Sequence, residues 1–169
     1  MPNDPVHAVI ALGSNLGDRE GHVRSAVACL ADLPCSTLIA VSTIRETQPE
    51  GECLQGPYLN GAVLIDTRLS PRCLLEALFE IERKHGRVRG KEQRWGPRTL
   101  DLDLILYGDM TCSEPGLVVP HPRMHLRRFV LEPLAEIAPG WLVPGIGMTA
   151  GELFMRVTDG SRPRDEGLV

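Results

Sequence analysis

The segment Thr99–Tyr107, with the sequence TLDLDLILY, constrains the fold more than any other part of the chain. Successive side chains of a β-strand point to opposite faces, so alternating leucine and aspartate predict a strand with one core face and one polar face. The expected core residues are Leu100, Leu102, Leu104 and Leu106. Asp101 and Asp103 are expected on the other face, with their Cα atoms about 7 Å apart.

The two aspartates are candidate metal ligands. Carboxylates that share a strand face repel each other unless a cation or a proton relieves the charge. Oxygen ligation by two aspartates suits Mg²⁺, which keeps water and phosphate oxygens as its other ligands. The alternative interpretation is a solvated strand face on which Asp101 and Asp103 pair with nearby arginines.

The segment before this strand is strongly basic. Residues 83–98 contain seven lysines and arginines and one acid, in a chain of net charge −4. Nucleic-acid-binding proteins usually have a basic face and a positive net charge. One basic segment in an acidic chain therefore favours a small or local polyanion as the ligand. Arginine donors chelate phosphate oxygens, and glycines at 86, 90 and 96 would let Gly86–Arg98 close over a ligand. The segment is predicted to be a phosphate lid, with a solvated surface loop as the alternative.

Position along this segment predicts different tasks for its side chains. Arg98 adjoins the strand that carries the two aspartates and is expected to stay near them. Arg87 and Arg89 are expected to lie farther out and to reach the ligand when the loop closes. Trp95, a ring in a polar stretch, is expected to stack on a flat ligand or a guanidinium, with core filling as the alternative.

Glu82 and His121 are further candidate contacts. Glu82 falls on the apolar stripe of its predicted helix, near the C-terminal end, where a carboxylate opposes the helix dipole. A contact with a ribose or a metal-bound water would explain it, and so would an ion pair with Arg89. His121 lies between two prolines and before several arginines, which favours a second anion contact. With His125 it forms H-x-x-x-H, but a zinc site there lacks a third ligand.

Two polar side chains are candidates for holding a heterocycle. Tyr58 and Asn60 share a strand face, and an amide offers one acceptor and two donors to a ring edge. The alternative for Asn60 is an ordinary polar residue at the edge of a sheet. Gly13–Asp18 lacks both glycine-rich phosphate-loop patterns and is predicted to be a structural turn.

Hydrophobic periodicity and cap residues divide the chain into strands and helices. Strands are predicted at His7–Leu12, Thr37–Thr47, Tyr58–Thr67 and Thr99–Tyr107, and helices at Arg19–Ala31 and from Pro71 to near Gly86. This βαββαβ order predicts an α+β, ferredoxin-like fold, an antiparallel sheet with two helices on one face and a C-terminal extension. Short helices are predicted in the extension at Arg127–Ala138 and Thr149–Val157. We expect a single domain over residues 1–157 and a loose C-terminal tail over 158–169.

Composition places the chain among soluble, unexported proteins. The apolar run Val6–Leu12 is too short for a signal peptide or a membrane span. Five cysteines, an odd number without a C-x-x-C pair, argue against a disulfide framework and a structural zinc site. We therefore expect a cytoplasmic monomer that binds neither membrane nor nucleic acid.

Five motifs stand out together. They are Ala11–Asn15 (ALGSN), Tyr58–Asn60 (YLN), Gly86–Arg89 (GRVR), Arg94–Leu104 (RWGPRTLDLDL) and Val119–His121 (VPH). In combination they resemble the 6-hydroxymethyl-7,8-dihydropterin pyrophosphokinase family, over about Val6 to Pro139. The resemblance implies a folate-pathway enzyme that transfers the β,γ-pyrophosphoryl group of ATP to the pterin hydroxymethyl oxygen, with two Mg²⁺ ions, and releases AMP.

The resemblance also implies roles for individual residues. The catalytic residues would be Arg87, Arg98, Asp101 and Asp103, of which the two aspartates match metal ligands. The ATP contacts would be Glu82, Arg89, Trp95, Arg98, Leu104, His121 and Arg127. The pterin contacts would be Thr47, Pro49, Tyr58, Asn60, Trp95 and Phe129, with the ring between Trp95 and Phe129.

Two other classes of protein match the sequence less well. A ferredoxin-like RNA-binding module needs aromatic residues displayed together on central strands, and the predicted strands offer only Tyr58 and Tyr107. A two-metal nuclease needs further acids and a longer basic track. For a pyrophosphokinase, we expect Asp101→Asn or Asp103→Asn to abolish turnover without loss of stability. We expect Arg87→Ala to slow the chemical step more than it weakens ATP binding.

Overall fold

The computed structural model describes residues 4–49, 55–87, 89–90 and 98–160. Its main strands are β1 (Val6–Ser14), β2 (Ser36–Val41), β3 (Arg45–Thr47), β4 (Tyr58–Thr67) and β5 (Asp101–Tyr107). They form an antiparallel sheet in the order β2–β4–β1–β5, and the short β3 also pairs with β4. Helix α1 (Arg19–Ala31) follows β1 and helix α2 (Pro71–Lys84) follows β4, so the predicted α+β, ferredoxin-like order βαββαβ is confirmed.

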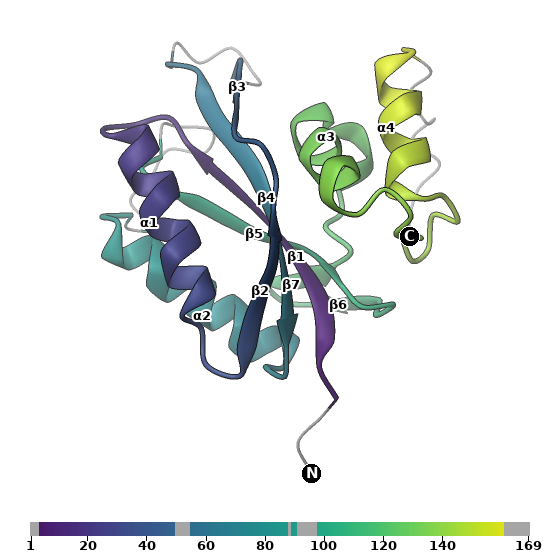
Figure 1. The fold of residues 1–169 in the computed structure, drawn as a ribbon, viewed down its shortest axis with the longest axis horizontal. Coiled ribbons are helices and arrows are strands. Elements are labelled where there is room, and N and C mark those ends of the chain that lie inside the picture. The colour runs from purple at the N-terminus through teal and green to yellow at the C-terminus, as the bar shows by residue number, and fades with distance from the viewer. Residues whose placement is uncertain (1–3, 50–54, 88, 91–97, 161–169) are drawn as a thin grey trace.

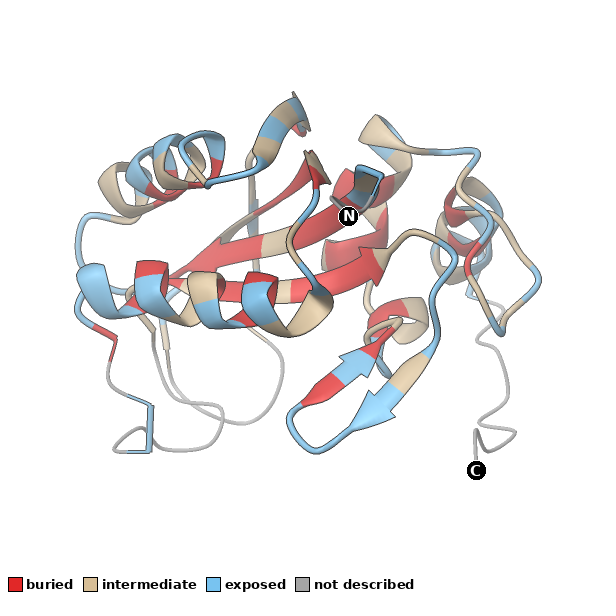
Figure 2. Ribbon diagram, turned by 90° about the horizontal axis from the view of Figure 1, so that it is seen from below, coloured by how far each residue is buried: buried red, intermediate tan, exposed pale blue. Residues whose placement is uncertain are grey.

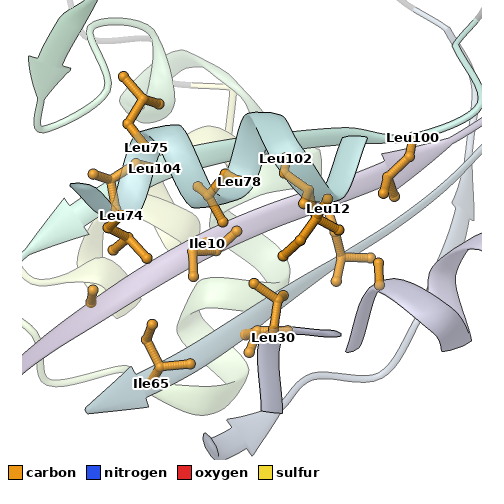
Figure 3. Packing of buried hydrophobic residues seen from close by; sticks show 14 of the residues in the cluster. Ile10, Leu12, Leu30, Ile65, Leu74, Leu75, Leu78, Leu100, Leu102 and Leu104 are labelled. Atoms are coloured by element: carbon orange, nitrogen blue, oxygen red, sulfur yellow. The ribbon is translucent and has the colours of Figure 1, made fainter. Parts of the chain in front are cut away.

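Helices cover both faces of the sheet (Figure 1). On one face, α1 and α2 bring Leu30 and Leu78 against Ile10 of the central strand β1 (Figure 3). On the other face, α3 (Arg128–Ile137) and α4 (Ala150–Thr158) form a second cluster of buried side chains with the sheet. The central strands β1, β4 and β5 are consequently buried along most of their length (Figure 2). The C-terminal extension is therefore a third layer of the fold.

The helices begin where the cap residues predict. Asp18 and Ser70 accept hydrogen bonds from first-turn backbone N–H groups of α1 and α2, at 3.0 and 3.2 Å. Such caps satisfy donors that have no partner inside the helix, and each stabilises it by about 1 kcal/mol. At the start of α4, Thr149 and Glu152 form the reciprocal hydrogen bonds of a capping box.

The prediction of one continuous strand over Thr37–Thr47 is wrong. At Ser42 the side-chain hydroxyl, rather than a backbone carbonyl, accepts the hydrogen bond of the Ala62 N–H (2.9 Å). The regular ladder is interrupted at this point, and β2 ends one residue earlier. The chain resumes pairing with β4 only at Arg45, where β3 begins.

The predicted position of Leu106 on the same face as Leu104 is also wrong. Ile10 of β1 lies opposite Leu104 and the preceding Val9 lies opposite Leu106, so Ile105 has no partner in the register. Such a β-bulge turns the residues beyond it to the other face. Leu104 belongs to the cluster under α1 and α2, and Leu106 belongs to the cluster under α3 and α4.

The C-terminal half adds elements that periodicity did not predict. They are a hairpin of β6 (Cys112–Glu114) and β7 (Leu117–Val119) and a 3₁₀ helix at Met124–Leu126. Thr158 is the last residue of α4, and residues 161–169 of the predicted tail lie outside the described residues. Within the described part of the chain, no helix is long and apolar enough to cross a membrane.

Glu136 of α3 connects the third layer to β3. Its carboxylate accepts hydrogen bonds from the Thr43 hydroxyl (2.7 Å), the Thr43 N–H (2.9 Å) and the Arg45 guanidinium (2.7 Å). These donors lower the pKa of Glu136 to about 2. Because β3 runs from Arg45 to Thr47, this contact holds the strand that brings Thr47 to the site described next.

Candidate active site

A cavity of about 390 Å³ lies on the α3 side of the sheet. Ten residues predicted for the site line it: Thr47, Pro49, Tyr58, Asn60, Arg98, Asp101, Asp103, His121, Arg127 and Phe129. Strand β5 contributes the acids, β4 contributes the polar pair, and the segment that leads into α3 contributes the basic and aromatic groups. The candidate metal ligands and the candidate heterocycle contacts therefore share one space.

Asp101 and Asp103 lie on the same face of β5, opposite small residues of β1. Asp101 is paired with Gly13, and Asp103 is paired with Ala11. The pKa of Asp103 is raised to about 7, first by burial and then by the negative charges of Asp101 and Glu82. A bound cation would favour the ionised form of Asp103, so this carboxylate pair fits a metal ion.

The wider surroundings indicate which kind of metal ion fits. Among the described residues, no group of three or more His, Cys, Asp and Glu side chains could hold a metal ion. Two aspartates therefore leave most ligand positions of a cation to water and to phosphate oxygens. Mg²⁺ bound to nucleotide phosphates is typically held in this way.

Arg87 lies inside the protein and contacts Asp101 directly. Its side chain is 3% exposed, and one terminal nitrogen donates to Glu82 Oε1 and to Asp101 Oδ1, both at 2.6 Å. A buried guanidinium needs carboxylates to compensate its charge, and these two supply them. The prediction that Arg87 lies farther out and arrives by loop closure is therefore wrong.

Glu82 is the centre of a buried network. Its side chain is 1% exposed and accepts hydrogen bonds from the Leu102 N–H (2.8 Å), from Arg87, and from Arg89 Nε (2.8 Å). Burial raises the pKa of Glu82, and the hydrogen bonds and positive charges of the two arginines act in the opposite direction. The ion pair with Arg89, one of the two interpretations from the sequence, is confirmed.

Two further predicted residues, Arg89 and Leu104, do not line this cavity. Arg89 is 45% exposed and stacks on Phe79, with its guanidinium carbon 4.1 Å from the ring centroid. Both residues line a second hollow of about 410 Å³ beside Glu82. Leu104 is 5% exposed and packs in the core, which leaves only its backbone for a ligand contact. Most of the predicted lid, including Trp95, lies outside the described residues.

Asn60, one of the two polar candidates on β4, lies inside the sheet. Asn60 is paired with Gly13 of β1 on one side and with Arg45 of β3 on the other, so its interpretation as an edge residue is wrong. The Asn60 amide nitrogen donates a hydrogen bond to the Thr47 hydroxyl, which orients the amide. A Cβ atom at position 13 would lie 2.9 Å from Asn60 Oδ1 and 3.5 Å from the Tyr58 ring. Glycine at this position therefore makes room for both side chains.

The segment before α3 and the first turn of α3 supply the opposite wall. The Arg127 guanidinium carbon lies 5.5 Å from the centroid of the Phe129 ring. His121 accepts a hydrogen bond at Nδ1 from the Arg123 N–H (3.2 Å), so its ring proton is on Nε2. Burial and the charge of Arg127 lower the pKa of His121 to about 4. His121 is therefore a neutral hydrogen-bond donor at physiological pH.

Several residues of the site had no role predicted from the sequence, and three of them are Gly13, Asn15 and Gln55. Gly13 and Gln55 line the cavity, and Asn15 lies behind it, where it contacts two of its walls. Two of them lie in Gly13–Asp18, which was predicted to be a structural turn because it lacks both glycine-rich phosphate-loop patterns. A glycine and an asparagine directly after an apolar central strand are the signal that could have identified them.

The chain is similar to a known protein family and to characterised bacterial enzymes. The family model for 7,8-dihydro-6-hydroxymethylpterin-pyrophosphokinase (HPPK) matches residues 9–139. The chain is 52% identical over 130 residues to the 2-amino-4-hydroxy-6-hydroxymethyldihydropteridine pyrophosphokinase of Bacillus subtilis, and the match covers 77% of each chain. It is 44% identical to the enzyme of the same name from Pseudomonas aeruginosa, over 80% of this chain and 82% of that one.

A solved structure supports the fold. The crystal structure of a Plasmodium falciparum HPPK-DHPS superposes with a TM-score of 0.73 at 14% identity, over 95% of this chain. The chain spans 45% of the length of that larger protein. Because the family model covers most of the chain and the curated relatives share about half of its aligned residues, the chain belongs to the HPPK family, enzymes of folate biosynthesis that transfer pyrophosphate from ATP to a hydroxymethyldihydropterin.

Proposed function

We propose that this chain transfers the β,γ-pyrophosphoryl group of ATP to the hydroxymethyl oxygen of 6-hydroxymethyl-7,8-dihydropterin and releases AMP. The proposal rests on one observation. Asp101 and Asp103 line the same cavity as Tyr58 and Asn60. The attacking oxygen must lie in line with the β-phosphorus and its leaving group, so both substrates must be held together. One cavity lined by both sets of side chains meets that requirement.

The phosphate side is built from two acids and several donors. Asp101 and Asp103 would hold two Mg²⁺ ions that arrive with ATP, and the bound ions would neutralise charge on the phosphates. Arg98 donates to Asp101 Oδ2 at 3.1 Å, so its guanidinium already lies where phosphate oxygens would bind. Arg127 adds positive charge from the opposite wall, and His121 offers its Nε2–H as a neutral donor.

The pterin side is built from groups that recognise a flat heterocycle. The amide of Asn60 and the hydroxyl of Thr47 offer donors and acceptors to the ring edge. Phe129 offers an aromatic surface to one face of the ring. Stacking of Trp95 on the second face stays a prediction from the sequence, because Trp95 lies outside the described residues.

Catalysis in this proposal rests on positioning and on charge neutralisation. His121 is not the base that removes the hydroxymethyl proton, because its Nδ1 accepts a hydrogen bond from the Arg123 N–H and its Nε2 carries a proton. The side chains of Arg98 and Arg127 have a different role, because their positive charges stabilise the negative charge that develops on the transferred group.

The proposed activity is tested by product analysis. The purified protein should form AMP from ATP only when both Mg²⁺ and 6-hydroxymethyl-7,8-dihydropterin are present, with one pterin diphosphate formed for each AMP. Chromatographic separation of the nucleotides measures both products. Release of ADP, or AMP formation without the pterin, would contradict pyrophosphoryl transfer.

We also propose that the chain acts as a monomer. Support comes from the ten predicted site residues that line one cavity within a single copy of the chain. Light scattering coupled to size-exclusion chromatography checks the oligomeric state.

The cytoplasmic location is proposed from the cysteine pattern alone.

Gly13→Ala is expected to raise the KM for the pterin by about tenfold and to leave ATP affinity unchanged. The added Cβ would lie 2.9 Å from Asn60 Oδ1, so the amide must move and its hydrogen bonds to the ring edge weaken. Gly56→Ala is the control, because the nearest contact of its Cβ is an ordinary 3.9 Å. Steady-state kinetics at saturating ATP measures both variants. If Gly13→Ala and the wild type have the same KM for the pterin, Asn60 does not contact the pterin.

A further inference from the structure

Asn15 follows β1 and is 8% exposed. Its side-chain oxygen accepts a hydrogen bond from the Arg98 N–H at 2.7 Å. Its side-chain nitrogen donates to Gln55 Oε1 at 2.9 Å and to the Gly56 carbonyl at 3.3 Å. The backbone N–H of Asn15 also donates to the Arg98 carbonyl at 3.1 Å. Asn15 thus bonds to two segments, each of which places a residue in the cavity wall.

These two segments serve opposite sides of the site. Gln55 lines the cavity and lies just before Tyr58, on the pterin side. Arg98 lines the cavity and donates to Asp101, on the phosphate side. Asn15 is separated from Gln55 by 40 residues and from Arg98 by 83 residues in the sequence. One side-chain amide therefore joins three distant segments of the chain.

The pattern of contacts requires a carboxamide. An asparagine amide has two N–H donors and one acceptor oxygen, and here both donors face Gln55 and Gly56 while the oxygen faces Arg98. A carboxylate at position 15 would keep the acceptor for the Arg98 N–H. It would lose both donors and would place an oxygen against the Gly56 carbonyl, which can only accept.

We propose that Asn15 is a positioning residue that holds the pterin-side wall and Arg98 at a fixed spacing, so that a ligand bound to one wall aligns the other. The inference rests on the proposed pyrophosphoryl transfer and specifies how one chain keeps two substrates in line. In-line transfer is sensitive to small displacements, and a misplacement of about 1 Å costs on the order of 100-fold in rate. Asn15 therefore controls turnover without lining the cavity.

The alternative role is simple anchoring of the loop before β4, and Arg19 provides a matched control for it. Arg19 Nη1 donates to the Pro57 carbonyl at 2.8 Å, and Nη2 donates to Glu46 at 3.0 Å. These contacts hold the same loop to α1 and β3. If anchoring of the loop were the whole function of Asn15, then removal of Arg19 would have the same kinetic effect.

Steady-state kinetics separates the two roles. Asn15→Ala is expected to lower kcat by about 30-fold, because both walls lose their common contact. Asn15→Asp should raise the KM for the pterin by about tenfold and change the affinity for ATP less, because the acceptor for Arg98 remains. Arg19→Ala should keep kcat within about threefold of wild type. Thermal unfolding of each variant shows that it is folded, and if Asn15→Ala does not fold, Asn15→Asp carries the test.

Amide hydrogen exchange provides a readout that does not depend on turnover. Addition of the pterin alone should slow exchange of the Arg98 N–H in the wild type and have little effect on it in Asn15→Asp. The inference is overturned if the pterin slows exchange of the Arg98 N–H equally in the wild type and in Asn15→Asp. It is also overturned if Arg19→Ala lowers kcat as much as Asn15→Ala does. Absence of AMP formation by the wild type would instead contradict the proposed function, and the exchange experiment would still decide the role of Asn15.

Discussion

Asp103→Asn is expected to raise the free energy of unfolding at pH 8 by on the order of 2 kcal/mol and to lower turnover by at least about 100-fold. The pKa of Asp103 in the folded protein is about 7, above its usual 3.8. Between these two pH values Asp103 is ionised in the unfolded chain but protonated in the folded protein, so the folded state loses stability as the pH rises, and the full penalty is present above pH 7. Asparagine removes this penalty, together with the carboxylate that would hold Mg²⁺.

Asp101→Asn should also abolish turnover but should change stability in the opposite direction. Asp101 accepts hydrogen bonds from Arg87 (2.6 Å) and Arg98 (3.1 Å), and an amide would lose the ionic part of both. We expect a loss of about 1 to 2 kcal/mol in the free energy of unfolding. Like-charge repulsion alone predicts the same stability change for both aspartates, and the structure separates them.

Urea unfolding without divalent metal, at pH 5 and pH 8, measures both stability effects. The advantage of Asp103→Asn over the wild type should shrink at the lower pH, because Asp103 is then largely protonated in the folded protein. AMP formation at saturating Mg²⁺ measures turnover. A stability gain that does not depend on pH would contradict the explanation from the Asp103 pKa, and retained activity in both variants would remove the metal assignment.

Arg87→Ala is expected to lower the free energy of unfolding by about 3 kcal/mol, whereas Arg89→Ala should lower it by less than about 1 kcal/mol. The two arginines bind the same carboxylate, that of Glu82, and differ in burial, with 3% and 45% of their side chains exposed. Loss of Arg87 removes a buried charge that compensates both Glu82 and Asp101. Loss of the exposed partner is screened by water.

The Arg87 and Arg89 variants also test the kinetic role of this segment. Turnover and stability should fall together in Arg87→Ala, because Asp101 loses the side chain that orients it. Arg87→Lys keeps the charge but lacks the planar set of donors, so we expect an intermediate effect on both quantities. Chemical denaturation and single-turnover kinetics on the same preparations provide the measurements. Equal stability of Arg87→Ala and Arg89→Ala would show that burial does not determine how much each arginine stabilises the fold. An Arg87→Ala variant that is as stable as the wild type but slow would show that Arg87 acts as a lid residue.

The alternation of leucine and aspartate was sufficient to place the two acids on one strand face, because side-chain direction in a strand depends only on neighbouring residues. The same reasoning failed at Leu106. A bulge in the pairing of β5 with β1 turns this residue to the other face, and no pattern within β5 indicates where the partner strand shifts its register. The interruption at Ser42 is similar, since it depends on a hydrogen bond to Ala62 of another strand.

The sequence likewise predicted one part of the candidate site and not another. Motif resemblance assigned ten of the residues that line the cavity, because family motifs record side chains whose chemistry the reaction needs. It did not show that Arg87 is buried against Glu82 and Asp101. It also assigned an ATP contact to Leu104, whose core position the alternation of leucine and aspartate had predicted correctly. Charge and glycine content predicted a loop that opens and closes, and the burial of Arg87 depends on contacts that composition does not contain.

By itself the sequence determined the order of helices and strands, the helix starts at Asp18 and Ser70, and the family, because each of these depends on residues close together in the chain or on whole motifs. Only the tertiary structure decided which side chains meet. Arg87 contacts Asp101 across 14 residues, and Asn15 contacts Gln55 across 40 and Arg98 across 83. Such contacts arise when the sheet and its layers assemble, since packing then brings distant segments within hydrogen-bond distance and buries the charges that must be paired.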